Sequence, residues 1–150
     1  MEFEDSVVLA APRAAVWAFF LDPYELGKCL PGVEKVEVFE PDRVFGGVAT
    51  LNVAGGSVQL PARVEWLERQ AMRGGRLRAM TKVAGHSVAG EGVIELEDTP
   101  EGGTHLYWTA GVVVPPAISD NPLLLQVARG VVTQFINAFF ECIQARLEAV

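Results

Sequence analysis

Alternation of apolar and polar residues dominates the middle of the chain. Between Val33 and Val114 the sequence divides into about six runs, separated by short glycine-rich or proline-containing segments such as "PDR", "AGGS" and "EGGT". In the run "VQLPARVEW", residues 58–66, every second residue is apolar. Because successive strand side chains point to opposite faces, and glycine supplies the positive φ of tight turns, this pattern predicts an antiparallel sheet with one face in water.

Different patterns flank these runs. The opening segment "FEDSVVLAAP" alternates loosely up to Pro12 and predicts a first strand. Pro12 then begins a short apolar helix that ends at Asp22-Pro23. Asp is a good N-cap and proline suits the first helical position, so the same dipeptide begins a second short helix, "YELGKCL", which Pro31-Gly32 ends. Tyr24, Leu26 and Leu30 of this segment are expected to point inward.

The end of the chain predicts one long helix, with Asn121 as its cap and Pro122 in its first turn. At 100° per residue its apolar side chains fill an arc of roughly 200°, wider than the usual apolar stripe. We therefore expect the sheet to engulf this helix. The apolar positions are Leu124, Val127, Ala128, Val131, Val132, Phe135, Ile136, Phe139, Phe140 and Ile143.

The order of these elements predicts an α+β fold in a single domain, residues 1–150. Two short helices follow the first strand, and a curved antiparallel sheet of about seven strands wraps around the long C-terminal helix. Such an arrangement buries the apolar faces of sheet and helix together. A chain of 150 residues is long enough to form one core of this kind.

Composition and charge exclude several partners. Half of the residues are hydrophobic, the net charge is -7, and no compact cluster of Lys and Arg occurs, so neither nucleic acid nor simple charge attraction to anionic lipid is expected. The acidic N-terminus lacks the basic residues of a signal peptide. Polar residues such as Arg129 interrupt the apolar C-terminal passage, so no transmembrane segment is expected. These features predict a cytoplasmic protein.

Residues with catalytic or metal-binding chemistry are few. His86 and His105 are both placed near strand ends, and no catalytic set of side chains or metal-ligand spacing emerges. Cys29 and Cys142 lie far apart in the sequence without redox or metal spacing, and we expect reduced thiols, with Cys29 packing at a helix end. The sequence therefore predicts no catalytic residue and no metal.

The first 37 residues carry a family resemblance. The Val16-Trp17 pair, the Asp22-Pro23 junction and the "CLPG" of residues 29–32 resemble the CoxG family of carbon monoxide dehydrogenase subunits, within the START-like (SRPBCC) helix-grip superfamily. The resemblance implies an apolar cavity between the sheet and the long helix. It also implies an association with molybdenum-containing carbon monoxide dehydrogenase in assembly, membrane recruitment or quinone handling. Longer members continue into an apolar tail, whereas this chain stops at Val150, so contact with the inner face of the membrane is expected only through a partner.

These observations predict that the protein binds a hydrophobic small molecule, lipid-like or quinone-like, as a non-enzymatic accessory without any other cofactor. Plain core packing is the alternative role for the aromatic residues. A polyketide cyclase-like or hydratase-like enzyme would need a polar group in the cavity, for which only Thr81, Asp5 and Arg146 are candidates. A protein-interaction role, with dehydrogenase subunits or as a homodimer, also remains open. The expected cavity residues are Leu26, Leu30, Leu51, Val64, Trp66, Trp108, Val131, Phe135 and Phe139.

Overall fold

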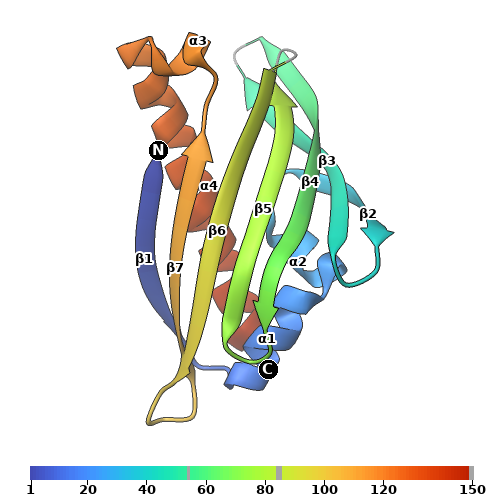
Figure 1. Cartoon of the computed structure of the whole chain (residues 1–150), viewed down its shortest axis with the longest axis vertical. Coiled ribbons are helices and arrows are strands. Elements are labelled where there is room, and N and C mark those ends of the chain that lie inside the picture. The colour runs from blue at the N-terminus through green and yellow to red at the C-terminus, as the bar shows by residue number, and fades with distance from the viewer. Residues whose placement is uncertain (54, 84–85, 149–150) are drawn as a thin grey trace.

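The computed structural model describes residues 1–53, 55–83 and 86–148 and has the predicted α+β order (Figure 1). A short helix before the long one, α3, is the one element that the sequence pattern did not indicate. The elements are β1 (Glu2–Leu9), α1 (Arg13–Leu21), α2 (Pro23–Cys29), β2 (Val33–Glu40), β3 (Val44–Val53), β4 (Gly56–Gln70), β5 (Gly74–Val83), β6 (His86–Asp98), β7 (Thr104–Val113), α3 (Pro116–Ser119) and α4 (Pro122–Glu148).

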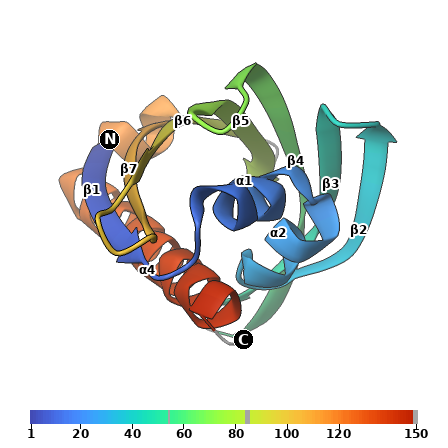
Figure 2. The same ribbon diagram turned by 90° about the horizontal axis from the view of Figure 1, so that it is seen from below.

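The seven strands form one antiparallel sheet in the order β1-β7-β6-β5-β4-β3-β2. Only the pairing of β1 with β7 joins strands that are not neighbours in sequence, and it leaves β1 and β2 as the two edges. The sheet curves strongly, and α1, α2 and α4 lie on its concave side (Figure 2). The predicted helix-grip architecture is confirmed.

Both predicted helix caps are present. The Asp22 carboxylate accepts hydrogen bonds from the backbone N–H groups of Tyr24 and Glu25, at 3.0 and 3.3 Å. The Asn121 side chain accepts from Leu123 and Leu124 at the start of α4, at 3.1 and 3.2 Å. Each cap satisfies donors that the first helical turn leaves without a partner.

The hydrophobic core lies at one end of the concave face. Helices α1 and α2 cover that end, which is the lower end in Figure 1. Phe20 of α1, Leu106 of β7 and Ile143 of α4 meet there, and each is at least 98% buried. The opposite end of the concave face has no such cover from α1 or α2.

The expectation that the sheet engulfs the long helix is wrong. Of the described residues of α4, only Ile143 is buried, whereas Leu123, Val127 and Val131 are 69%, 58% and 52% exposed. The physical reason is that an open sheet contacts only one side of a helix, and a 200° apolar arc is wider than that side. The arc is therefore divided between the interior and the solvent.

The expected pair of reduced thiols is also wrong. Cys29 and Cys142 form a disulfide that joins α2 to α4, with their Cα atoms 5.4 Å apart and 113 residues between them in sequence. Distance along the chain does not measure distance in space, and the fold brings these two helices side by side. Tyr24, which was expected to point inward, is 56% exposed.

Candidate functional site

An apolar cavity of about 250 Å³ lies between the concave face of the sheet and α4. Phe20 of α1 and Leu26 and Leu30 of α2 form the wall toward the core. Residues 77, 79, 90, 92 and 108–112 of β5, β6 and β7 contribute to the floor, and Val64 of β4 extends it. The wall opposite the floor comes from α4 and consists of Val132, Phe135, Ile136, Phe139 and Phe140.

Small residues at neighbouring inward positions of the sheet create the space. Gly92 lies opposite Leu77 on one side and Ala110 on the other, and Gly90 lies opposite Ala79. Directly opposed residues of antiparallel strands share a face, so a side chain at either glycine position would point toward the cavity. The repeated glycine in "AGEGV" is the sequence signal that could have located this floor in advance.

Aromatic rings form the side of the cavity next to β7 and α4. Trp108 stacks on Phe140 with ring centroids 5.0 Å apart and an interplanar angle of 18°. Phe139 meets Phe140 edge to face at 5.3 Å and Phe20 at 6.5 Å. Such pairs add stability beyond the burial of their area. This wall is therefore a preformed apolar surface.

The polar residues considered for catalysis are engaged elsewhere. The Thr81 hydroxyl donates a hydrogen bond to the carbonyl of Pro61 at 2.7 Å. Asp5 is exposed and accepts from the backbone N–H of Ser6. Arg146 pairs with Glu25 at the surface. None of these three side chains lines the cavity.

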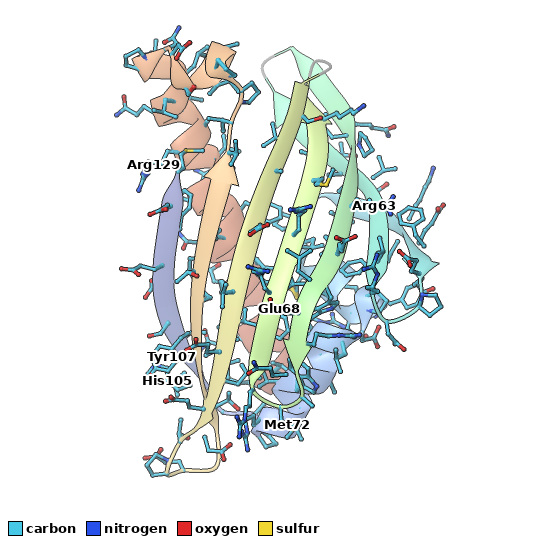
Figure 3. All side chains as sticks on the ribbon, in the orientation of Figure 1. Arg63, Glu68, Met72, His105, Tyr107 and Arg129 are labelled. Atoms are coloured by element: carbon cyan, nitrogen blue, oxygen red, sulfur yellow. A yellow bond between two sulfur atoms is a disulfide. The ribbon has the colours of Figure 1, made fainter. Side chains whose placement is uncertain are left out.

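Other ionisable residues near this region face the outer side of the sheet. Glu91 contributes to the cavity boundary, but its carboxylate pairs with Arg78 at 3.2 Å on the outer face. His105 stacks on Tyr107 on the same outer face, at the lower end of β7 (Figure 3). Across residues 1–53, 55–83 and 86–148, no three His, Cys, Asp or Glu side chains gather as metal ligands.

The structure brings six of the nine expected cavity residues together: Leu26, Leu30, Val64, Trp108, Phe135 and Phe139. Trp66 is instead buried in the core against Trp17, with ring centroids 5.9 Å apart. Val131 is exposed on α4. The side chain of Leu51 lies outside the described residues. The role of the six in binding a ligand stays a prediction.

The size of the cavity sets limits on a ligand. About 250 Å³ is slightly below the roughly 300–1,000 Å³ of small-molecule sites and holds a volume equal to roughly eight waters. Volume alone would favour a structural role. However, two of the inward-facing lining residues, Ala79 and Phe135, are exposed, so the space is open to solvent. A ring or a chain segment fits inside, and a longer ligand can extend through this opening.

Three wider hollows, of about 460, 600 and 480 Å³, lie on the outer face of the sheet and at its β1 edge. Each has charged side chains in its lining: Glu4 and Glu95 in the first, Arg78 and Glu91 in the second, and Glu2 and Glu4 in the third. Charged side chains at these positions are unsuited to an apolar ligand, because each would have to leave water. The concave cavity is therefore the better candidate site.

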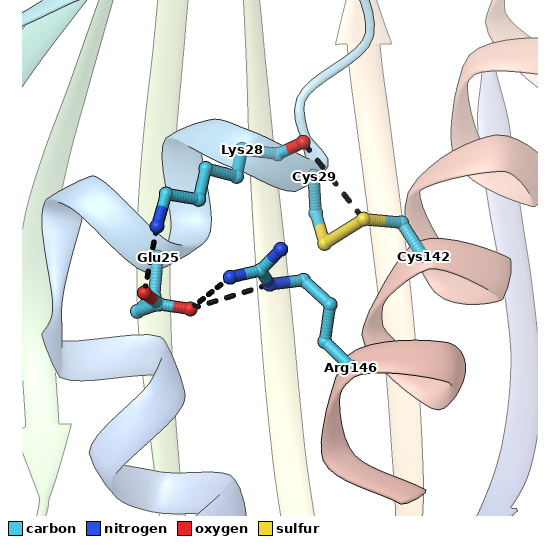
Figure 4. The surroundings of a disulfide bond; sticks show 5 residues. All are labelled: Glu25, Lys28, Cys29, Cys142 and Arg146. Carbon is cyan, nitrogen blue, oxygen red and sulfur yellow. Dashed lines mark hydrogen bonds and ion pairs between the residues drawn. A yellow bond between two sulfur atoms is a disulfide. The ribbon is translucent and has the colours of Figure 1, made fainter. Parts of the chain in front are cut away.

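A covalent and ionic junction holds the lower part of α4 against α2 (Figure 4). Beside the disulfide, Arg146 places two nitrogens 2.6 and 3.2 Å from one carboxylate oxygen of Glu25. Lys28 donates to the other oxygen at 3.1 Å. The hydrogen bonds from Arg146 and then Lys28 hold the pKa of Glu25 below its usual value.

Comparison with known proteins identifies relatives for almost the whole chain. The family model that describes the CoxG subunit of carbon monoxide dehydrogenase matches residues 6–148. No match was found among curated proteins.

Solved structures share the fold at low sequence identity. A conserved protein from Geobacillus kaustophilus is 22% identical with a TM-score of 0.84, and the alignment covers 98% of this chain and 95% of that one. Ara h 8.0201 is 15% identical with a TM-score of 0.72, covering 100% and 99%. A START superfamily protein from Mycobacterium smegmatis is 12% identical with a TM-score of 0.67, covering 99% and 97%. The fold is thus of the START/Bet v 1-like helix-grip type.

Proposed function

The chain belongs to the CoxG family of carbon monoxide dehydrogenase subunits, and from this premise we propose that it binds a hydrophobic small molecule, lipid-like or quinone-like, in the cavity between the sheet and α4. The observation that carries this proposal is an open cavity whose inward-facing described side chains are all apolar. Removing apolar surface from water favours such binding by roughly 25 cal/mol per Å².

Several features of the wall suit a flat or flexible apolar ligand. The Trp108–Phe140 pair offers ring faces and edges to a planar group such as a quinone head. The glycine and alanine floor lets the ligand approach the backbone of β6 and β7 closely. Because the described cavity walls present no ionisable side chain, we favour binding over catalysis of the cyclase or hydratase type.

The accessory role is the second part of the proposal. Membership of this family supports a function beside a molybdenum-containing dehydrogenase, in which the bound molecule is carried to or from that enzyme. We propose the cytoplasm as the location of this role, although disulfides such as Cys29–Cys142 are rare in that compartment. Both statements rest on the family and not on a contact in the structure.

The cavity floor provides a direct test. The Gly92→Val substitution adds three carbon atoms that point into the cavity, and a Cβ built on Gly92 meets only the carbonyl oxygen of Thr109, at an ordinary 3.5 Å. Gly111→Val is the matched control, because Gly111 lies on the neighbouring strand opposite Glu91 and faces outward with no atom within 4 Å of a built Cβ. Both changes add the same side chain to the same sheet.

Binding is measured with ubiquinone-1, whose quinone quenches tryptophan fluorescence, and independently with palmitate by calorimetry. Trp108 lies in the cavity wall and reports on a bound quinone directly. We expect saturable binding by the original protein and by Gly111→Val, and at least tenfold weaker binding by Gly92→Val. Equal binding by all three proteins, or no binding of either probe, would contradict the proposal.

A further inference from the structure

The Cys29–Cys142 disulfide lies where two walls of the cavity meet (Figure 4). On α2, Cys29 falls between Leu26 and Leu30, which belong to the wall toward the core. On α4, Cys142 follows one turn after Phe139, which belongs to the wall opposite the sheet. One covalent bond therefore fixes the spacing of the two walls at the lower end of the cavity.

Apart from the disulfide, few buried groups attach α4 to the rest of the protein. Among its described residues only Ile143 is buried, and half-buried rings such as Phe140 add further contact. Arg146 pairs with Glu25 of α2, but both side chains are 37% exposed, and exposed ion pairs contribute little stability. Segments that bury few apolar side chains are the first to open locally. The position of α4 therefore depends strongly on the disulfide.

The two sulfur atoms differ in their access to solvent. Cys29 is 2% exposed, whereas Cys142 is half-buried. Thiol–disulfide exchange begins when a thiolate attacks an accessible sulfur. The Sγ of Cys142 is therefore the atom that a reductant reaches. The carbonyl oxygen of Lys28 lies 3.8 Å from this sulfur and is placed to accept a hydrogen bond from the thiol that reduction creates.

The proposed location favours a redox role for this bond. Disulfides are rare in the cytoplasm, and those that occur there are usually catalytic or redox-sensing. Catalytic disulfides of oxidoreductases join the closely spaced cysteines of a Cys-X-X-Cys motif, whereas Cys29 and Cys142 are 113 residues apart. Redox sensing is the role that fits such a long-range bond between two walls of a cavity.

We infer that the Cys29–Cys142 bond is a site of thiol–disulfide exchange with a protein dithiol, and that its reduction opens the cavity. The oxidised protein retains its ligand, and the reduced protein releases it. This inference deepens the proposed function and rests on it for the ligand.

The exchange has two steps. A thiolate of the dithiol attacks the Sγ of Cys142, the bond between the two protein sulfurs breaks, and Cys29 leaves as a thiolate that takes up a proton. The second thiol of the reductant then attacks the mixed disulfide and releases the Cys142 thiolate, which also takes up a proton. In total, two electrons and two protons pass from the dithiol to the protein, and the dithiol becomes a disulfide.

The structural consequence is a local opening. Without the bond, the lower end of α4 can separate from α2, and the fraction of molecules with a closed cavity falls. The apparent affinity for a ligand falls in proportion to that fraction. Oxidation by a disulfide of the same class reverses the exchange and closes the cavity again.

The first experiment tests the exchange itself. The folded, oxidised chain is incubated with reduced thioredoxin without denaturant, the reaction is stopped with acid, and thiols are blocked with N-ethylmaleimide in guanidinium. Mass spectrometry then counts the blocked cysteines. We expect both cysteines to be blocked after treatment and neither before it. A bond that resists thioredoxin in the folded protein would overturn the inference.

Hydrogen exchange tests whether the opening is local. In the oxidised protein, the amides of residues 137–143 in α4 should exchange about as slowly as those of β5. After reduction with dithiothreitol, they should exchange about tenfold faster than those of β5, or more. Equal acceleration of α4 and β5 would indicate global destabilisation only, and would contradict a local opening.

Ligand release is measured with palmitate by calorimetry, because quinones react with thiols. We expect reduction by dithiothreitol to raise the Kd for palmitate about tenfold or more, and reoxidation with oxidised glutathione to restore it. The double variant Cys29→Ala/Cys142→Ala is the matched control, since it has no bond to lose. It should bind as weakly as the reduced protein and should not respond to dithiothreitol. Circular dichroism establishes that it is folded, and the reduced original protein provides the same comparison independently.

Two outcomes separate this inference from the proposed function. Palmitate binding that reduction leaves unchanged means that only the inference fails. Exchange with thioredoxin and local opening of α4, without palmitate binding by the oxidised protein, mean that the exchange site stands and the proposed function fails.

Discussion

Loss of the Cys29–Cys142 disulfide should destabilise the protein strongly. The perturbation is the double substitution Cys29→Ala/Cys142→Ala, or a reductant added to the original protein. Alanine is chosen because Cys29 is 2% exposed and a serine hydroxyl would be buried there.

The magnitude follows from the loop that the disulfide closes. With a sequence separation of 113 residues, the chain-entropy relation gives about 4.8 kcal/mol at 25 °C. Measured values for disulfides are typically about 2–4 kcal/mol. For a chain of 150 residues, about 2–4 kcal/mol corresponds to a fall in melting temperature of roughly 5–15 °C.

The assay is urea unfolding followed by circular dichroism, with and without dithiothreitol. We expect the original protein to lose stability when it is reduced, and the double alanine variant to be unstable to the same degree and insensitive to dithiothreitol. Two titratable thiols in the folded, unreduced protein would refute the disulfide. A double alanine variant as stable as the oxidised protein would refute the estimated contribution of the disulfide to the free energy of unfolding.

The remaining predictions concern separate contacts. Gly92→Val should leave the free energy of unfolding unchanged or raise it by roughly 0.5–1 kcal/mol, because valine restricts the unfolded chain and causes no clash in the strand. Urea unfolding of Gly92→Val and Gly111→Val measures this free energy. Asp22→Ala should cost about 1 kcal/mol in the same assay, because it removes the cap of α2, and a larger loss in Asp22→Asn than in Asp22→Ala would contradict this reason. The pKa of Glu25 is lowered in the folded state, so its contribution to stability is present above the unfolded value of 4.5 and is lost as pH falls through the lower folded pKa. Melting temperatures measured from neutral to acidic pH should therefore fall more steeply in the original protein than in Glu25→Gln, and parallel curves would contradict the role of the pair with Arg146.

Features that depend on neighbouring residues were predictable from the sequence. The two caps at Asp22 and Asn121 need only the next few backbone N–H groups, and strand alternation needs only the residues of one run. The six correctly grouped cavity residues follow from the same local rules, because parity along a strand and periodicity along a helix determine which side chains face inward. Trp66 shows where those rules stop. It has the right parity, but α1 covers its end of the sheet, and Trp17 fills the space in front of it.

Features that depend on the distance between elements were not predictable in this way. The width of the apolar arc of α4 indicates how much of the helix surface is apolar, but not which element packs against it. The prediction that the sheet buries the whole arc therefore did not follow from the sequence. The cysteines are a similar case. A separation of 113 residues suggested two independent thiols, and only the packing of α2 on α4 brings their Cα atoms to 5.4 Å.

The two errors have a common structural cause, which bears on function. Helix α4 is held at its lower end by Ile143, by the disulfide and by the Arg146–Glu25 pair, while its upper half contributes little buried surface. A covalent bond at one end allows the helix to stay attached even though its other end buries little. In the upper half, one side of the helix closes the cavity, while Leu123, Val127 and Val131 on the adjacent side are exposed. A fully engulfed helix would have given a more stable core, but it would have left no opening at Phe135 through which a hydrophobic ligand can enter.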